Sequence, residues 1–215
     1  MADKVPLLSR LLLVLTPFSV FSAQAENNAT TPNLSQLLSP IKSMTAAFTQ
    51  TVTDFEGTVL QISRGDLSIA EPNRIRWIIN RPMPQQIISD GVQIWLFDPD
   101  LEQVIIQAYD ANLAATPVGL FSGDSEAING AFSVAYDQTI SIVDSFVLTP
   151  KNTQALYQSL RFDFAAQQPQ TLEFIDSLGQ ITRIELNNVE VNPALADNLF
   201  TFKIPDGVDI INHVD

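Results

Sequence analysis

Few residues in this sequence are suited to catalysis or metal binding. The chain of 215 residues has no cysteine and one histidine, His213, two residues from its end. A thiol nucleophile, a zinc–thiolate site, a Ser-His-Asp triad and an imidazole metal site therefore lack their components. The segment GLFSG at 119–123 places a serine beside a glycine, but its spacing differs from a G-x-S-x-G elbow and no strand precedes it. We expect no enzymatic activity, no bound metal and no cofactor.

Two charged groups remain. Asp98, Asp100 and Glu102 place acidic oxygens at alternate positions, but the ligand set of a calcium loop is incomplete, so a solvated turn is the better interpretation. The arginines at 64, 74, 76 and 81 form the basic concentration of an acidic chain. They either lie on a solvent-facing side and pair with surface carboxylates, or bind an acidic partner.

The first 25 residues have the layout of a secretory signal peptide. Lys4 and Arg10 supply a positive n-region, an apolar h-region follows at 11–21, and AQA at 23–25 fits a cleavage site. The apolar stretch is shorter than the about 20 residues that span a bilayer. We expect this segment to direct export to the periplasm and to be cleaved after Ala25, which leaves one domain at 26–215. The alternative is an uncleaved anchor.

The mature chain is strongly acidic. Cleavage removes two positive charges and one negative charge, which moves the formal charge from −13 to −14. Such a chain is repelled by nucleic acid and by anionic membrane surfaces, so we expect no nucleic-acid partner. Without cysteine it has no attachment site for the lipid of a bacterial lipoprotein. These features predict a free protein of the periplasm, and we expect it to be a monomer.

The positioning elements are one helix and many short strands. Thr31-Pro32 is typical of a helix start, and Leu34, Leu37, Leu38, Ile41, Met44 and Phe48 follow at helical spacing. Pro40 should kink that amphipathic helix or delay its start. Beyond Phe48 the period becomes two, with turns at 54–57, 64–65, 71–73 and 81–82. Further strands are expected at 132–136, 145–149, 159–164, 171–176, 180–186 and 199–202, which favours an antiparallel meander curling toward a barrel.

Two segments raise the question of what covers their apolar residues. The run QIWLF at 93–97 is apolar on both faces of a strand, so one face needs a second covering layer or an apolar ligand. The segment 110–123 has no strand period and is interpreted either as a short helical lid or as an ordinary connection. A plain core explains most single apolar residues, but together the helix, strands and segment suggest a cavity for acyl chains.

An ordered set of short motifs resembles the LolA family of periplasmic lipoprotein carriers over essentially the whole mature chain. The motifs are FTQ at 48–50, GDL at 65–67, EPNRIRW at 71–77, SDG at 89–91, IW at 94–95, FDPDLEQV at 97–104, TP at 116–117, FVLTPK at 146–151, DSLGQ at 176–180 and FTFKIPDGVD at 200–209. The resemblance implies a mainly β fold with some α: an incomplete, strongly curved antiparallel β-barrel whose hydrophobic cavity is covered by an N-terminal amphipathic helix and a short helical lid.

The implied function is transport without catalysis. A carrier of this family receives acylated outer-membrane lipoproteins from an inner-membrane ABC transporter, shields their acyl chains, and passes them to an outer-membrane receptor. Resemblance and strand parity together assign the cavity to Met44, Phe48, Leu67, Ile69, Ile75, Trp77 and Ile79. They assign the lid to Leu113, Pro117, Val118, Leu120 and Phe121.

One position departs from the family pattern. Glu71 stands where the family usually has an arginine that is tied to lid closure and cargo release. A latch made by that arginine cannot form in the same way here, and Arg64 or Arg74 are candidate substitutes. The alternative function is a periplasmic lipid-binding or lipid-sensing module on the same half-barrel, acting in envelope stress signalling.

Overall fold

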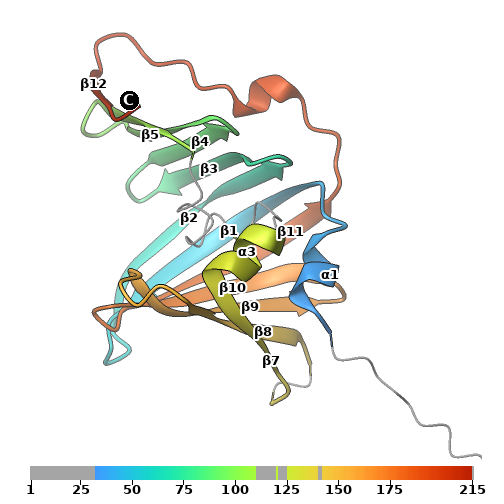
Figure 1. Ribbon diagram of the computed structural model, residues 1–215. Helices are drawn as coiled ribbons and strands as arrows, with labels where there is room; N and C mark the ends of the chain where they lie inside the picture. Colours follow the sequence, from blue (N-terminus) through green and yellow to red (C-terminus); the bar gives the residue numbers. More distant parts are fainter. Residues whose placement is uncertain (1–31, 110–119, 121–124, 140–141, 215) are drawn as a thin grey trace, which may run out of the picture. The chain divides into compact units, whose positions relative to one another are not determined.

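The computed structural model describes residues 32–109, 120, 125–139 and 142–214, which fall within one compact unit. Twelve strands form a single sheet in the order β12-β6-β5-β4-β3-β2-β1-β11-β10-β9-β8-β7 (Figure 1). Every neighbouring pair is antiparallel except β12–β6, which is parallel. The sheet is curved and its two edge strands, β12 and β7, do not pair, so the barrel stays incomplete. The predicted fold class is confirmed.

The strands alternate with tight turns along most of the chain. Their bounds are β1 Ser43–Thr53, β2 Val59–Ala70, β3 Arg74–Arg81, β4 Gln85–Asp90, β5 Gln93–Asp98, β6 Gln103–Ala108, β7 Phe132–Asp137, β8 Asp144–Pro150, β9 Tyr157–Ala165, β10 Gln168–Asp176, β11 Ile181–Val191 and β12 Asp209–Asn212. Register shifts interrupt β1, β2 and β10, and such bulges bend and twist a sheet. The expected turns at 54–57, 71–73 and 81–82 are confirmed.

The expected N-terminal helix is much shorter than predicted. Helix α1 spans Leu34–Leu38, and Asn33 rather than Thr31 caps it by accepting the N–H of Ser35 at 2.9 Å. Helix α1 ends at Leu38 with Ser39 as its C-cap, and Pro40, which has no backbone N–H to donate, does not continue the helix. Met44 and Phe48 consequently lie on strand β1 and not on a helix. Within the described ranges, no helix is long and apolar enough to cross a bilayer.

Gly65 was expected in a turn but lies inside β2. Its lack of a side chain allows β3 and the ring of Phe48 to approach β2 closely. A β-carbon at Gly65 would stand 1.8 Å from the Ile78 carbonyl oxygen and 2.7 Å from Cζ of Phe48. Phe48 is the register partner of Gly65 on β1, and its ring lies 4.3 Å from that of Trp77 on β3. The missing side chain therefore leaves space that the Phe48 ring occupies.

The outer face of β4–β6 has its own apolar cover. Phe202 lies 5.6 Å from Phe97 and 6.3 Å from Trp95, measured between ring centroids. It belongs to the segment that leaves β11, passes through the 3-10 helix η2 (Asp197–Phe200) and reaches β12 (Figure 1). The predicted strand at 199–202 is thus wrong: this segment covers a sheet face, and the apolar run at 93–97 needs no ligand on that side.

The main core lies on the opposite, inner face. One buried cluster joins the inward residues of β1–β3 and β8–β11 to Leu34 and Leu38 of α1, to Leu120, and to Ile128 of α3 (Ser125–Ala131). Full burial of such a side chain contributes about 1.5–3 kcal/mol. The two helices are therefore held on the sheet chiefly by apolar packing.

Replacing Gly65 with alanine should destabilise the protein. The new methyl group would clash with backbone at Ile78, so β2 and β3 must separate, at about 3 kcal/mol. We expect the thermal midpoint to fall by roughly 6–12 °C in a calorimetric scan. Gly130→Ala, where a β-carbon meets nothing within 4 Å, is the matched control and should leave the midpoint nearly unchanged. Equal midpoints for both variants would contradict this account.

Candidate functional site

The predicted cavity residues form three rows across β1, β2 and β3. In the first row, Met44 on β1 pairs with Ile69 on β2, which pairs with Ile75 on β3. In the second row, Leu67 on β2 pairs with Trp77 on β3. In the third row, Phe48 on β1 pairs with Gly65 on β2, and Gly65 pairs with Ile79 on β3. Six of the seven are buried in the inner cluster, and Ile79 is half-buried against it. The structure therefore brings all seven together on one surface, while their contact with acyl chains stays a prediction.

A second half of the same surface is aromatic and was not singled out from the sequence. Phe146, Phe162 and Phe164 on β8 and β9 are fully buried. The rings of Phe162 and Phe164 lie 4.6 Å apart, and Phe146 meets Phe164 edge-on at 6.0 Å. The strict alternation of Leu160, Phe162 and Phe164 was the signal that could have identified the two rings on β9.

Short helical elements cover this surface. Leu34 and Leu38 of α1 and Ile128 of α3 are buried against it, and Leu120 has no exposed surface. The predicted lid residue Leu120 thus packs on the inner cluster. The other predicted lid residues, Leu113, Pro117, Val118 and Phe121, lie outside the described residues. A 3.4 Å hydrogen bond from Nδ2 of Asn129 to Oγ of Ser35 joins the two helices.

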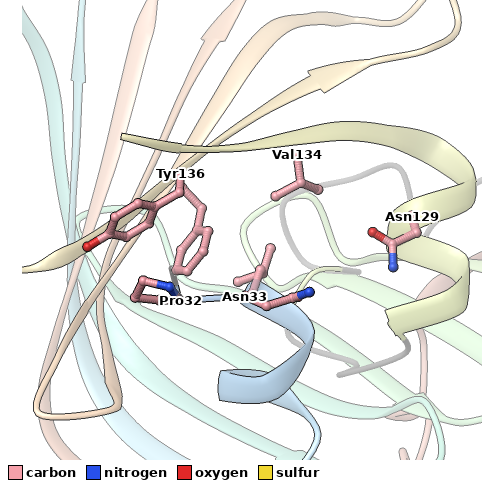
Figure 2. A pocket seen from close by; sticks show the side chains of 7 residues that line it. Pro32, Asn33, Asn129, Val134 and Tyr136 are labelled. Carbon is pink, nitrogen blue, oxygen red and sulfur yellow. The ribbon is translucent and has the colours of Figure 1, made fainter. Parts of the chain in front are cut away.

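A pocket opens where the covering helices meet the edge strand β7. Its volume is about 390 Å³, within the range of small-ligand sites. Figure 2 shows the start of α1 on one side and α3 and β7 on the other; the lining residues are Pro32, Asn33, Leu34, Asn129, Val134, Tyr136 and Phe146. The lining combines apolar side chains with two amides and one phenol, which suits a ligand that carries both apolar and polar groups.

Polar contacts fix the edge strand that lines this pocket. Asp137, at the end of β7, accepts hydrogen bonds from the hydroxyl and backbone N–H of Thr139 and from Arg161 on β9, at 2.6, 3.0 and 2.8 Å. These bonds lower the pKa of the Asp137 carboxyl to about 2. Ser145 on β8 accepts from Arg161 and donates to Asp163, so the three strands are tied together. Burial and Asp144 raise the pKa of the Tyr136 phenol.

Glu71 fastens the β2–β3 turn to the start of β1. Its carboxylate lies 2.9 Å from Nζ of Lys42, and its backbone N–H donates to the Lys42 carbonyl at 2.9 Å. Lys42 in turn donates its N–H to Oδ1 of Asn192, just beyond β11. Arg74, one candidate substitute for the missing arginine, is instead bound by Asp197 at 2.6 Å. The role of Glu71 in lid closure stays a prediction.

The acidic group at 98–102 forms a turn. Oδ1 of Asp98 accepts the backbone N–H groups of Asp100 and Leu101 at 3.0 and 3.1 Å. This side chain is engaged in shaping the β5–β6 connection, which agrees with the expectation of a solvated turn.

The Asp137 contacts should make the β7 edge sensitive to acid. The folded-state pKa lies below the ordinary 3.8, so the carboxylate stabilises the fold above about pH 4 and loses this effect as the pH falls toward 2. Asp137→Asn should lower the thermal midpoint at pH 6, and the difference from wild type should vanish near pH 2. Asp206→Asn, at an exposed position in the C-terminal segment, is the control. A difference that persists at pH 2 would contradict the assignment.

Known proteins resemble the chain over most of its length. The family model described as outer membrane lipoprotein carrier protein LolA matches residues 39–203. An outer-membrane lipoprotein carrier protein of Pseudomonas paraeruginosa is 41% identical over 189 residues, which cover 88% of this chain and 90% of the relative. One from Azotobacter vinelandii is 36% identical over 201 residues, covering 94% and 96%.

A solved structure shares the fold. An uncharacterized conserved protein from Thermus thermophilus superposes with a TM-score of 0.52 at 9% identity, covering 83% of this chain and 98% of the other. At that identity the likeness concerns the fold alone. The family model and the two carrier relatives establish the family: the chain belongs to the LolA family of outer membrane lipoprotein carrier proteins.

Proposed function

We propose that this protein is a periplasmic carrier that shields the acyl chains of outer-membrane lipoproteins. The observation that carries the proposal is the continuous apolar inner face of an open sheet, covered by short helices rather than by a second sheet. Family membership supports the class of cargo. The cargo would be taken from an inner-membrane ABC transporter and passed to an outer-membrane receptor, with the protein acting as a monomer and without a cofactor.

The acyl chains would occupy the inner surface only after its cover moves. The side chains of Met44, Leu67 and Ile75 are buried by the core and by the helices. Separating α1 and α3 from the sheet exposes apolar area to water, which acyl chains then cover again. Because the exchanged surfaces are similar, the net free energy of binding is small compared with the total apolar burial.

Weak net binding suits a carrier between two membranes. Each buried CH₂ contributes about 0.8 kcal/mol, so two or three long acyl chains hold a lipoprotein in a bilayer by roughly tens of kcal/mol. A carrier cannot extract such a cargo unaided, which is why an ATP-driven transporter is part of the proposal. The carrier must also bind less tightly than the receptor for delivery to proceed.

The decisive experiment is a release assay. Inner-membrane vesicles that hold a radiolabelled outer-membrane lipoprotein and the matching transporter are mixed with the purified protein and ATP. We expect label in the soluble fraction, in complex with this protein and dependent on ATP. If a known carrier releases label in the same vesicles and this protein does not, the transport proposal fails and a lipid-sensing module becomes the better interpretation.

Locking the two helices together should abolish loading. The native chain has no cysteine, so Ser35→Cys with Asn129→Cys introduces a single pair at two positions whose native side chains are hydrogen-bonded. We expect the oxidised variant to release less than about a tenth of the wild-type label, because the linked helices can no longer leave the sheet independently of each other. Reduction should restore release, and each single variant should behave like wild type. Full loading by the oxidised protein would show that the helices need not move independently of each other.

Reversing the charge at Glu71 should affect cargo delivery more than stability. Glu71→Arg replaces an exposed ion pair, worth less than about 1 kcal/mol, by repulsion from Lys42 at the junction of β1 with the β2–β3 turn. We expect a severalfold change in the rate of transfer to the receptor and a thermal midpoint within a few degrees of wild type. The double variant with Lys42→Glu restores the pair and is the control. Transfer rates equal to wild type would exclude a role for Glu71 in release.

A further inference from the structure

Three arginines on β2 and β3 have no carboxylate partner. Within the part of the chain that the structure describes, Arg64, Arg76 and Arg81 make no ion pair or side-chain hydrogen bond. The other cations of the sheet and its turns are engaged: Lys42 with Glu71, Arg74 with Asp197, Arg161 with Asp137 and Arg183 with Glu173. In a chain with 24 acidic residues and 11 basic ones, this local lack of counter-charge is conspicuous.

Two of these arginines face each other. Arg64 on β2 is the register partner of Arg81 on β3, at a point where the register shifts. Directly opposed residues of an antiparallel pair have β-carbons about 5 Å apart, and like charges there destabilise the sheet. The acidic residue of the strand pair, Asp66, accepts from Nδ2 of Asn80 at 2.8 Å and does not neutralise either arginine. Both side chains are exposed, so solvent weakens their repulsion, but no carboxylate of the described chain offsets it.

The chemistry of the group favours an acidic ligand in extended conformation. A guanidinium binds carboxylates through two parallel hydrogen bonds. Arg76 and Arg81 lie on one strand, roughly 16 Å apart at about 3.3 Å per residue, so an extended segment with acids at intervals of several residues matches their spacing. Arg64 and Arg76 alternate with Leu67, Ile75 and Trp77 and thus lie on the face turned away from the core. Arg81 reaches the same face because the register shift makes it the partner of Arg64.

A protein ligand fits this surface better than a membrane does. A formal charge near −13 repels an anionic bilayer as a whole, whereas a short acidic segment meets the three arginines alone. Met83, two residues beyond Arg81, has 56% of its surface exposed and offers an apolar contact beside the charges. We infer that the outer face of β2 and β3 at Arg64, Arg76 and Arg81 is a docking surface for an extended acidic segment of a partner protein.

This docking surface goes beyond the carrier function and does not depend on acyl binding, since it lies on the opposite face of the sheet. Its first test is stability. Arg64→Glu and Arg81→Glu, taken singly, each convert a repulsive pair into an attractive one and should raise the thermal midpoint by about 1–3 °C. The double variant opposes two acids and should lose that gain. Lower midpoints for both single variants would show that the arginines serve the fold, and would overturn the inference.

The second test is binding, measured by NMR on the isotope-labelled protein purified from the periplasm. The probe is the peptide acetyl-Glu-Leu-Glu-Glu-Leu-Glu-amide, with phosphatidylglycerol vesicles of equal total charge as the alternative ligand. We expect saturable shifts of the β2 and β3 amide signals, and peptide binding at least about fivefold weaker for Arg64→Glu. Lys203→Glu, which removes an exposed cation elsewhere in the chain, should bind as wild type does.

Two results would overturn the proposal. One is that the peptide perturbs no β2 or β3 signals, or perturbs them no more than those around Lys203. The other is that vesicles bind through the same arginines and the peptide does not, which would assign the surface to a membrane. Because neither test involves a lipoprotein or a transporter, failure here leaves the carrier proposal untouched, and failure of the release assay leaves this surface untouched.

Discussion

An apolar surface on the inside of a sheet that does not close is the constraint on which this structure depends. A closed small barrel fills its interior with its own side chains, but here β12 and β7 remain apart and the inner residues need a separate cover. Helices α1 and α3, together with Leu120, provide it. The cover is short and is held chiefly by apolar packing, a non-directional interaction that similar apolar groups can replace. An acyl chain is such a group, and this is the physical basis of the carrier proposal.

The sheet itself is held much more firmly than its cover. Long neighbouring strands pair β1 with both β2 and β11, so the sheet is continuous although β1 and β11 are far apart in the chain. Gly65 allows β1, β2 and β3 to pack with the rings of Phe48 and Trp77 between them. At the other end, Arg161 ties β7, β8 and β9 through Asp137 and Ser145. A rigid surface with a replaceable cover can accept a ligand while keeping its shape.

The outer face of the sheet is covered by the C-terminal segment in one region and is left uncovered in another. Beside β4–β6, the C-terminal segment packs Phe200 and Phe202 against the sheet and then adds β12 to its edge. Arg74 is held over the Phe200 ring and by Asp197, which joins this segment to β3. Further along β2 and β3, Arg64 and Arg81 are left without such a partner among the described residues. One face of the sheet thus has a region whose charges are paired and whose rings are covered, and a region in which two arginines are not paired.

Local patterns in the sequence determined most of the strands, because period-two alternation and turn residues act over a few positions. Alternation at 75–79 predicted which side chains face inward, and the ordered motifs indicated the family. The same patterns gave a wrong prediction where the helical and the strand period place the same residues on one face. Met44 and Phe48 are four residues apart, a spacing that places both on one face of a helix or of a strand, and Pro40 together with pairing to β2 and β11 decided for the strand.

Only the tertiary structure decided features that depend on distant neighbours. Gly65 looked like a turn residue because glycine is common in turns, yet its role is to admit the Phe48 ring and the Ile78 carbonyl. Phe200 and Phe202 alternate as in a strand, but Phe202 packs on Phe97 of β5, Phe200 meets Arg74 of β3, and β12 then pairs with β6. The pairing of Glu71 with Lys42 and the opposition of Arg64 to Arg81 are likewise set by register. Sequence alone gives the type of each residue and its local period, whereas the partner across the sheet is fixed only when the whole chain has folded.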